Sequence, residues 1–209
     1  MRITSLAVAL ALGLEASAAL AQPNLRSTFP GRRIGGGTRG ECAARLLAHL
    51  VPADSVFAAG PSSSVGLLLG PTADPRPLQI ELRPQAPGGG AAGAGASQRR
   101  QLPAAPLGVT LLRLPAVSGP EIWESSYVCS EGGPASTDPL SFVEAVSPPA
   151  LSLLVRESTP KDQAIQAALA KLRGLCGAEV ARTELASGFG LEDVVTGPEW
   201  PERIPVRCP

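Results

Sequence analysis

The residues near the start of the chain that are best suited to chemistry form a basic, glycine-rich run over residues 32–42, which ends at Cys42. Glycine-rich loops bind phosphate when their N–H groups lie between a strand and the N-terminus of a helix. This run follows a segment with no apolar period and lacks the G-x-x-x-x-G-K-[ST] spacing. It also lacks a G-x-G-x-x-G followed by an acid near the end of a second strand. We therefore predict no nucleotide site here, and nothing in the sequence indicates what Arg39 does.

Nucleophilic catalysis needs a serine or cysteine beside a base. The segment 62–66 resembles half of a nucleophile elbow, but Ser62 stands where the first glycine of G-x-S-x-G belongs, so a polar turn explains it better. The only histidine, His49, precedes every serine that it might be paired with. A lone histidine is more often packed or exposed than catalytic. A hydrolase that uses His49 is therefore kept only as the weaker, enzymatic alternative.

The carboxylates are scattered and no motif fixes two of them in a cleft, so we interpret them as solvated surface: Glu121, Glu124, Glu144, Glu157, Glu192 and Asp193. The formal net charge is zero, and net charge alone implies no acidic or basic partner such as nucleic acid. The sequence predicts no catalytic, cofactor-binding or metal-binding residue.

The first residues are typical of an export signal. Arg2 is a short positive start, an apolar core follows over residues 6–14, and Ala19-Leu20-Ala21 forms an A-x-A cleavage site, so we place the cut after Ala21. The apolar run is well below the roughly 18 to 20 residues of a membrane span. We expect residues 1–21 to be removed and the mature chain to be periplasmic or extracellular, with no integral membrane segment.

Four cysteines in an exported chain favour disulfides over a metal site, because the spacing holds no C-x-x-C pair. Sequence alone allows three connectivities. We favour Cys42–Cys129 and Cys176–Cys208, which would close one loop in the strand-rich part and another around the C-terminal part. Each such loop is worth about 4 kcal/mol in the chain-entropy model.

Most of the chain has a period of two, which is typical of strands. The clearest case is Leu78, Ile80 and Leu82 alternating with polar residues. Further strands are expected at residues 56–59, 65–69, 109–114, 123–129, 140–146 and 151–155. Residues 43–52 fit either a short helix face or a strand face. Many short strands with frequent turns predict a mainly β fold, an antiparallel, Ig-like β-sandwich over residues 41–157.

Two segments are expected to lack regular structure. Residues 22–40 are rich in Pro, Gly, Arg and Ser/Thr, which predicts a flexible N-terminus. Residues 84–101 contain a Gly/Ala tract that buries too little surface to offset its ordering entropy, which predicts a disordered loop. Arg99 and Arg100 at its end are interpreted as solvating charges.

The pattern changes after residue 158. Thr159, Pro160 and Asp162 form a variant of the capping box, and apolar residues at i, i+3, i+4 and i+7 follow until Gly174. A second, weaker helix is expected at residues 178–186. The proline-rich tail should be extended and held by Cys208, so that residues 158–209 form a helical segment and tail.

Several short blocks are similar to the bacterial secreted family catalogued as domain of unknown function 928. They comprise the glycine-rich run with Cys42, Leu50-Val51-Pro52, residues 108–115, Trp123 leading to Cys129, Phe142-Val143-Glu144 and the helix after Pro160. The resemblance covers roughly residues 32–186 and implies a strand-rich envelope domain with a helical end and no assigned reaction. It also implies that Cys42 and Cys129 match the family's two cysteines. The family's aromatic-rich strand is replaced here by residues 65–69, which puts an aromatic ligand surface in doubt.

Together these observations predict an exported, non-enzymatic interaction or structural module of the periplasm or cell surface. Its partner would be an envelope protein or a surface glycan. One alternative is a carbohydrate-binding or peptidoglycan-binding module that uses Trp123 and Tyr127, which requires both rings to be exposed. The sequence indicates neither the identity of the ligand nor the oligomeric state.

Overall fold

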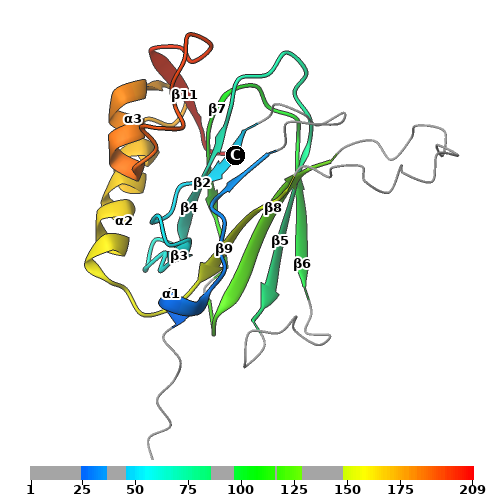
Figure 1. Cartoon of the computed structure of the whole chain (residues 1–209), viewed down its shortest axis with the longest axis vertical. Helices are drawn as coiled ribbons and strands as arrows, with labels where there is room; N and C mark the ends of the chain where they lie inside the picture. The colour runs from blue at the N-terminus through cyan, green and yellow to red at the C-terminus, as the bar shows by residue number, and fades with distance from the viewer. Residues whose placement is uncertain (1–24, 37–45, 86–96, 116, 129–147) are drawn as a thin grey trace, which may run out of the picture.

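The computed structural model describes residues 25–36, 46–85, 97–115, 117–128 and 148–209. These residues form two β-sheets that pack face to face, with two helices on the outer face of one of the sheets (Figure 1). The expected signal segment, the Cys42–Cys129 pair and the strand at residues 140–146 lie outside the described residues. No helix in the described part is long and apolar enough to cross a membrane.

The first sheet has six strands. In spatial order they are β1 (Ile34–Gly35), β2 (Leu47–His49), β4 (Ser64–Leu69), β7 (Gly108–Arg113), β11 (Arg203–Arg207) and β10 (Glu179–Ala181). All neighbours are antiparallel except β11 and β7, which run parallel. The uncertain segment 43–52 therefore contributes a strand, β2.

The second sheet has five strands. Their order is β3 (Val56–Phe57), β9 (Ala150–Leu154), β8 (Glu121–Tyr127), β5 (Leu78–Pro84) and β6 (Gln98–Leu102). The pair β3 and β9 is parallel. The mainly β class is thus as predicted, but each sheet contains one parallel pair, so the sheets are mixed and not antiparallel throughout, and the Ig-like topology stays a prediction. The period of two identifies strands and carries no information about which strands become neighbours.

The inner faces of the two sheets form the main core. Leu78, Ile80 and Leu82 of β5 are all buried, in agreement with the predicted alternation. In the opposite sheet, Val65 and Leu67 of β4 are also buried and face β5. They pair with inward-facing residues of β7. Because aromatic residues are scarce, this core is built mainly from leucine and valine.

Helix α2 (Pro160–Arg173) begins and ends as predicted, with a capping box between Thr159 and Asp162 and with Gly174 as its C-cap. It packs on the six-stranded sheet through Leu169, directly over Gly66 of β4. A Cβ at Gly66 would lie 2.7 Å from Leu50 Cδ1 and 3.0 Å from Leu169 Cδ2. Glycine at this position therefore lets the helix approach the sheet closely.

The second C-terminal helix differs from the prediction. Residues 179–181 of the expected second helix form β10, and helix α3 (Arg182–Phe189) starts after them and ends at Gly190, whose φ is 57°. The proline-rich tail forms β11, which lies between β7 and β10. Ile204 and Val206 are buried, and the residues on either side of each are more exposed. This alternation is the period of two of a strand, which the surrounding prolines obscure in the sequence. The structure joins Cys176 to Cys208, the second predicted disulfide, just beyond the end of this strand.

The two segments expected to be irregular contain ordered elements. Residues 25–36 of the predicted flexible N-terminus hold helix α1 (Leu25–Thr28) and strand β1. Leu25 and Phe29 pack on a second apolar cluster, on the outer face of the five-stranded sheet. In the predicted disordered loop, Pro84 ends β5 and residues 98–101 belong to β6. Strand β6 was missed because its residues are mostly polar, and strand prediction depends on an alternation of apolar and polar residues.

Asp162 joins the N-terminal segment to helix α2. Its carboxylate is completely buried, and it accepts hydrogen bonds from Arg26 Nη2 (2.7 Å), Thr159 N (2.7 Å) and Ala58 N (3.1 Å). One carboxylate therefore caps a helix, pairs with a cation and holds the chain that follows β3. Buried charges are tolerated only when they are paired in this way.

We predict that Asp162→Ala lowers the free energy of unfolding by about 3 kcal/mol, because it removes a helix cap and leaves buried N–H groups and Arg26 without their acceptor. Urea denaturation followed by circular dichroism measures this loss. Asp193→Ala removes an exposed carboxylate and is the control. Equal stability of the two variants would contradict this account of Asp162.

Candidate functional site

His49 lies between the two sheets, completely buried. Its ring stacks on the indole of Trp123, with centroids 3.6 Å apart and planes at 4°. Its Nδ1 lies 2.8 Å from Ser152 Oγ. Strand register explains why His49 contacts both side chains, because Trp123 of β8 and Ser152 of β9 are paired and share the inner face of their sheet. The single histidine of the chain therefore belongs to a cross-sheet contact.

The His49–Ser152 pair resembles the start of a nucleophilic dyad, but its surroundings do not suit catalysis. Both side chains have no exposed surface, and neither lines either of the two cavities between the sheets that are described below. Burial lowers the pKa of His49 well below its usual value, so the imidazole is neutral near pH 7. A neutral, enclosed ring stacked on an indole stabilises the packing of the sheets, and in this conformation it has no route to a substrate.

Trp123 and Tyr127 do not form an exposed binding surface. Trp123 has no exposed surface and Tyr127 is only 8% exposed. The Tyr127 hydroxyl donates a hydrogen bond to Leu46 O (3.0 Å), which ties β8 to the segment before β2. Carbohydrate binding through these two rings, which was one alternative from the sequence, is therefore incompatible with the structure.

The other candidate residues have structural roles. Arg33, in the basic run, donates to Val51 O (2.9 Å), Phe189 O (2.6 Å) and Gly190 O (2.5 Å), so it binds carbonyls at the C-terminal end of α3. Burial lowers the pKa of its guanidinium, with the nearby carboxylates acting in the opposite direction. Ser62 Oγ donates to Ala59 O (3.2 Å) in the predicted polar turn. Among the described residues, no group of histidine, cysteine and carboxylate side chains has the arrangement of a metal site.

The two edges of the sandwich differ. On one edge, backbone hydrogen bonds join Arg32 to Leu151 (2.9 and 2.7 Å) and Gly36 N to Pro148 O (3.0 Å), so the sheets are linked there. Gly35 makes this possible, because a Cβ would lie 2.4 Å from Ala150 N. On the other side, β6 ends its sheet, and two cavities lie between the sheets.

The larger cavity has a volume of about 530 Å³ and is mainly apolar. Leu69, Thr110 and Val206 line it from the six-stranded sheet, and Leu78 and Leu102 line it from the five-stranded sheet. Ala105 and the Cys176–Cys208 disulfide also line it. Part of the wall therefore belongs to the C-terminal strand and its cross-link.

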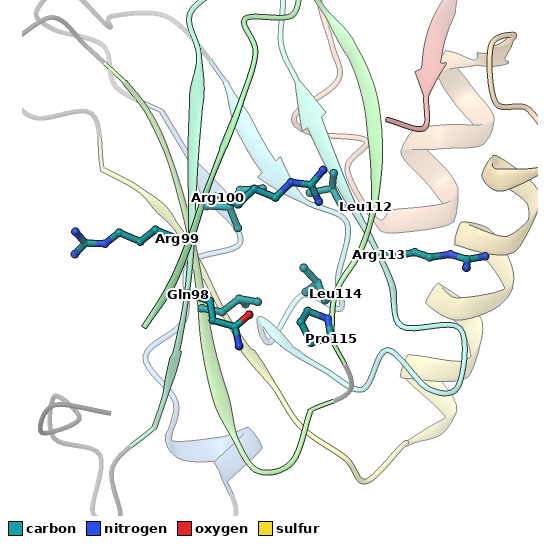
Figure 2. Close-up of a pocket in the computed structure, with 9 residues that line it drawn as sticks. Gln98, Arg99, Arg100, Leu112, Arg113, Leu114 and Pro115 are labelled. Atoms are coloured by element: carbon teal, nitrogen blue, oxygen red, sulfur yellow. The ribbon is translucent and has the colours of Figure 1, made fainter. Parts of the chain in front are cut away.

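The smaller cavity, about 390 Å³, lies further along the same two strands, β5 and β7 (Figure 2). Its apolar side chains are Ile80, Leu82, Leu112 and Leu114, and Gln98 and Arg100 enter it from β6. Sequence reasoning missed this site because residues 98–101 were interpreted as loop. The alternation of Gln98, Arg100 and Leu102 on one face was the available signal.

The fold and site define a disulfide-containing domain of two mixed β-sheets, with one helical layer and an open, apolar edge. Comparison of the chain with models of known protein families, with curated proteins and with solved structures finds no match in any of the three. The resemblance to the secreted family named above therefore stays a prediction.

His49 predicts a definite pH dependence of stability. Its folded pKa is lowered, so below pH 6.5 the unfolded chain binds a proton that the folded chain does not, and stability falls as the pH falls. The slope from this group reaches at most about 1.4 kcal/mol per pH unit. Urea denaturation of the wild type between pH 7 and 5 should show the decline.

His49→Phe keeps a ring beside Trp123 and removes the titrating group, so this slope should disappear in the variant. Glu121, whose pKa is raised by burial, acts in the opposite direction and remains in both proteins. The difference between the two pH profiles therefore isolates His49. Parallel profiles would contradict the buried, neutral imidazole.

Proposed function

We propose that this chain is an exported, non-enzymatic interaction module of the periplasm or cell surface, and that the open edge of its sandwich is the binding surface. The expected signal at residues 1–21, the Cys176–Cys208 disulfide and the resemblance to a secreted envelope family support the export. The complete burial of His49 and Ser152, away from both cavities, favours binding over catalysis.

The observation that carries the proposal is the 530 Å³ cavity between the sheets. Sites for small molecules are typically concave, mostly apolar and roughly 300–1,000 Å³ in volume. This cavity combines leucine and valine walls with Thr110 and Arg207 as polar groups. Arg207 is held in place by Pro106 O (3.2 Å) and Leu107 O (2.9 Å), so it is part of a formed wall.

The cavity is predicted to bind an uncharged apolar probe. Nile red fluoresces more strongly and at shorter wavelength in apolar surroundings, and both changes should appear on addition of the mature protein. Ala105→Trp places an indole in the cavity and should weaken binding about tenfold or more, because it fills the space that the dye needs.

Ala170→Trp is the matched control, since Ala170 is exposed on helix α2 and lines neither cavity. It should bind the dye like the wild type. No binding by the wild type, or equal binding by Ala105→Trp, would refute the open edge as a binding surface.

Export has a separate test. The full chain, expressed in a bacterium with an outer membrane, should be recovered from the periplasmic fraction with Gln22 as its first residue, as read by mass spectrometry. Leu10→Arg places a charge in the apolar core of the signal and should keep the chain in the cytoplasm. Cytoplasmic wild-type protein that retains residues 1–21 would contradict export.

A further inference from the structure

Both cavities are lined by an arginine, but the Arg207 guanidinium of the larger one donates to Pro106 O and Leu107 O, whereas no described residue accepts from the Arg100 guanidinium in the smaller one. We call the smaller cavity the Arg100 cleft, lined by Ile80, Leu82, Gln98, Arg99, Arg100, Leu112, Arg113, Leu114 and Pro115. Figure 2 shows the Arg100 side chain extending from β6 toward Leu112 of β7, whereas the side chains of Arg99 and Arg113 point away from the space between the strands.

Strand register places Arg100 in this position. It pairs with Ile80, whose buried side chain faces the core, so Arg100 shares the inward face of the sheet. The neighbouring Arg99 pairs with Glu81 on the outward face and donates from Nε to Glu81 Oε2 (3.0 Å). Adjacent arginines of one edge strand therefore have different surroundings, one beside a carboxylate and the other beside leucines.

The charge of Arg100 has no counterpart in the cleft. No acidic residue lines the cavity, and the Arg100 guanidinium makes no ion pair or hydrogen bond with another residue of the described ranges. Its apolar neighbours Ile80 and Leu112 cannot accept a hydrogen bond from the guanidinium. A cation above apolar walls complements a molecule that has an anionic head and an apolar tail.

We propose that the Arg100 cleft binds an anionic amphiphile of the fatty-acid type, a proposal that rests on the proposed function of the open edge. The carboxylate accepts hydrogen bonds from the Arg100 guanidinium, whose planar fork matches a carboxylate in a bidentate pair. The acyl chain then lies against Ile80, Leu82 and the leucines of the opposite strand. The cavity volume of about 390 Å³ suits a short or medium chain.

Edge protection is the rival explanation. Inward-pointing charges on edge strands prevent two sheets from pairing edge to edge, and β6 is an edge strand. In that case Arg100 needs no ligand, and its removal would change self-association alone. The two explanations therefore differ in what a variant does to binding.

The test compares octanoate with 1-octanol, which share a tail and differ in the charge of the head, by titration calorimetry on the mature protein. The wild type should bind octanoate at least tenfold more tightly than 1-octanol. Arg100→Gln should lower octanoate affinity at least tenfold to a hundredfold, the range for a single charge-assisted hydrogen bond and a lower bound for the bidentate pair, and leave 1-octanol affinity unchanged.

Arg99→Gln is the matched control, because it removes an equal charge from the outward face of the same strand, and it should leave both affinities unchanged. Acetate, which has the head without the tail, should bind far more weakly than octanoate. Equal octanoate affinity in wild type and Arg100→Gln, or acetate binding as tight as octanoate, would overturn the proposal. Sedimentation analysis in which Arg100→Gln changes only self-association would establish edge protection instead.

Failure of the Arg100 proposal can be distinguished from failure of the proposed function. Nile red is uncharged and its predicted site, blocked at Ala105, is the larger cavity, which shares no lining residue with the Arg100 cleft. Dye binding that is lost in Ala105→Trp, together with no octanoate preference, would retain the binding edge and reject the Arg100 cleft as an anion site.

Discussion

The contact between His49 and Trp123 is the constraint on which the arrangement of the two sheets depends. It is a flat stack of two rings, one from each sheet, and it is enclosed by leucine and valine side chains. A charged imidazole would lose its hydration there without gaining a carboxylate, so the ring must stay neutral. The hydrogen-bonding contact with Ser152 fixes the orientation of the ring, and with it the facing positions of β2, β8 and β9.

The two edges of the sandwich on either side of this contact differ in how the sheets are joined. Toward β1, backbone hydrogen bonds around Arg32 and Gly36 link the two sheets. Toward β6, no such bonds are found among the described residues, and the sheets leave two cavities between them. The same core therefore has a linked edge and an open edge, and the open edge is where we propose that binding takes place.

Much of the fold follows from patterns that the sequence displays. Alternation identified β5, β7, β8 and β9, and the capping box located helix α2. The patterns failed where a strand is short and its neighbours are prolines, as in β11, or where its residues are polar, as in β6. The Arg100 cleft depends on the second failure, because only the pairing of β6 with β5 turns Arg100 inward. Pairing between strands is a long-range property that local periodicity does not encode.

The position of β11 has a consequence for how the protein acquires its structure. This strand comes after every other described strand in the chain, yet it lies inside the six-stranded sheet and pairs in parallel with β7, about 97 residues earlier. Contacts between such distant segments form slowly, because a long loop must close first. During synthesis the six-stranded sheet therefore stays incomplete until residues 203–207 are available to pair with β7.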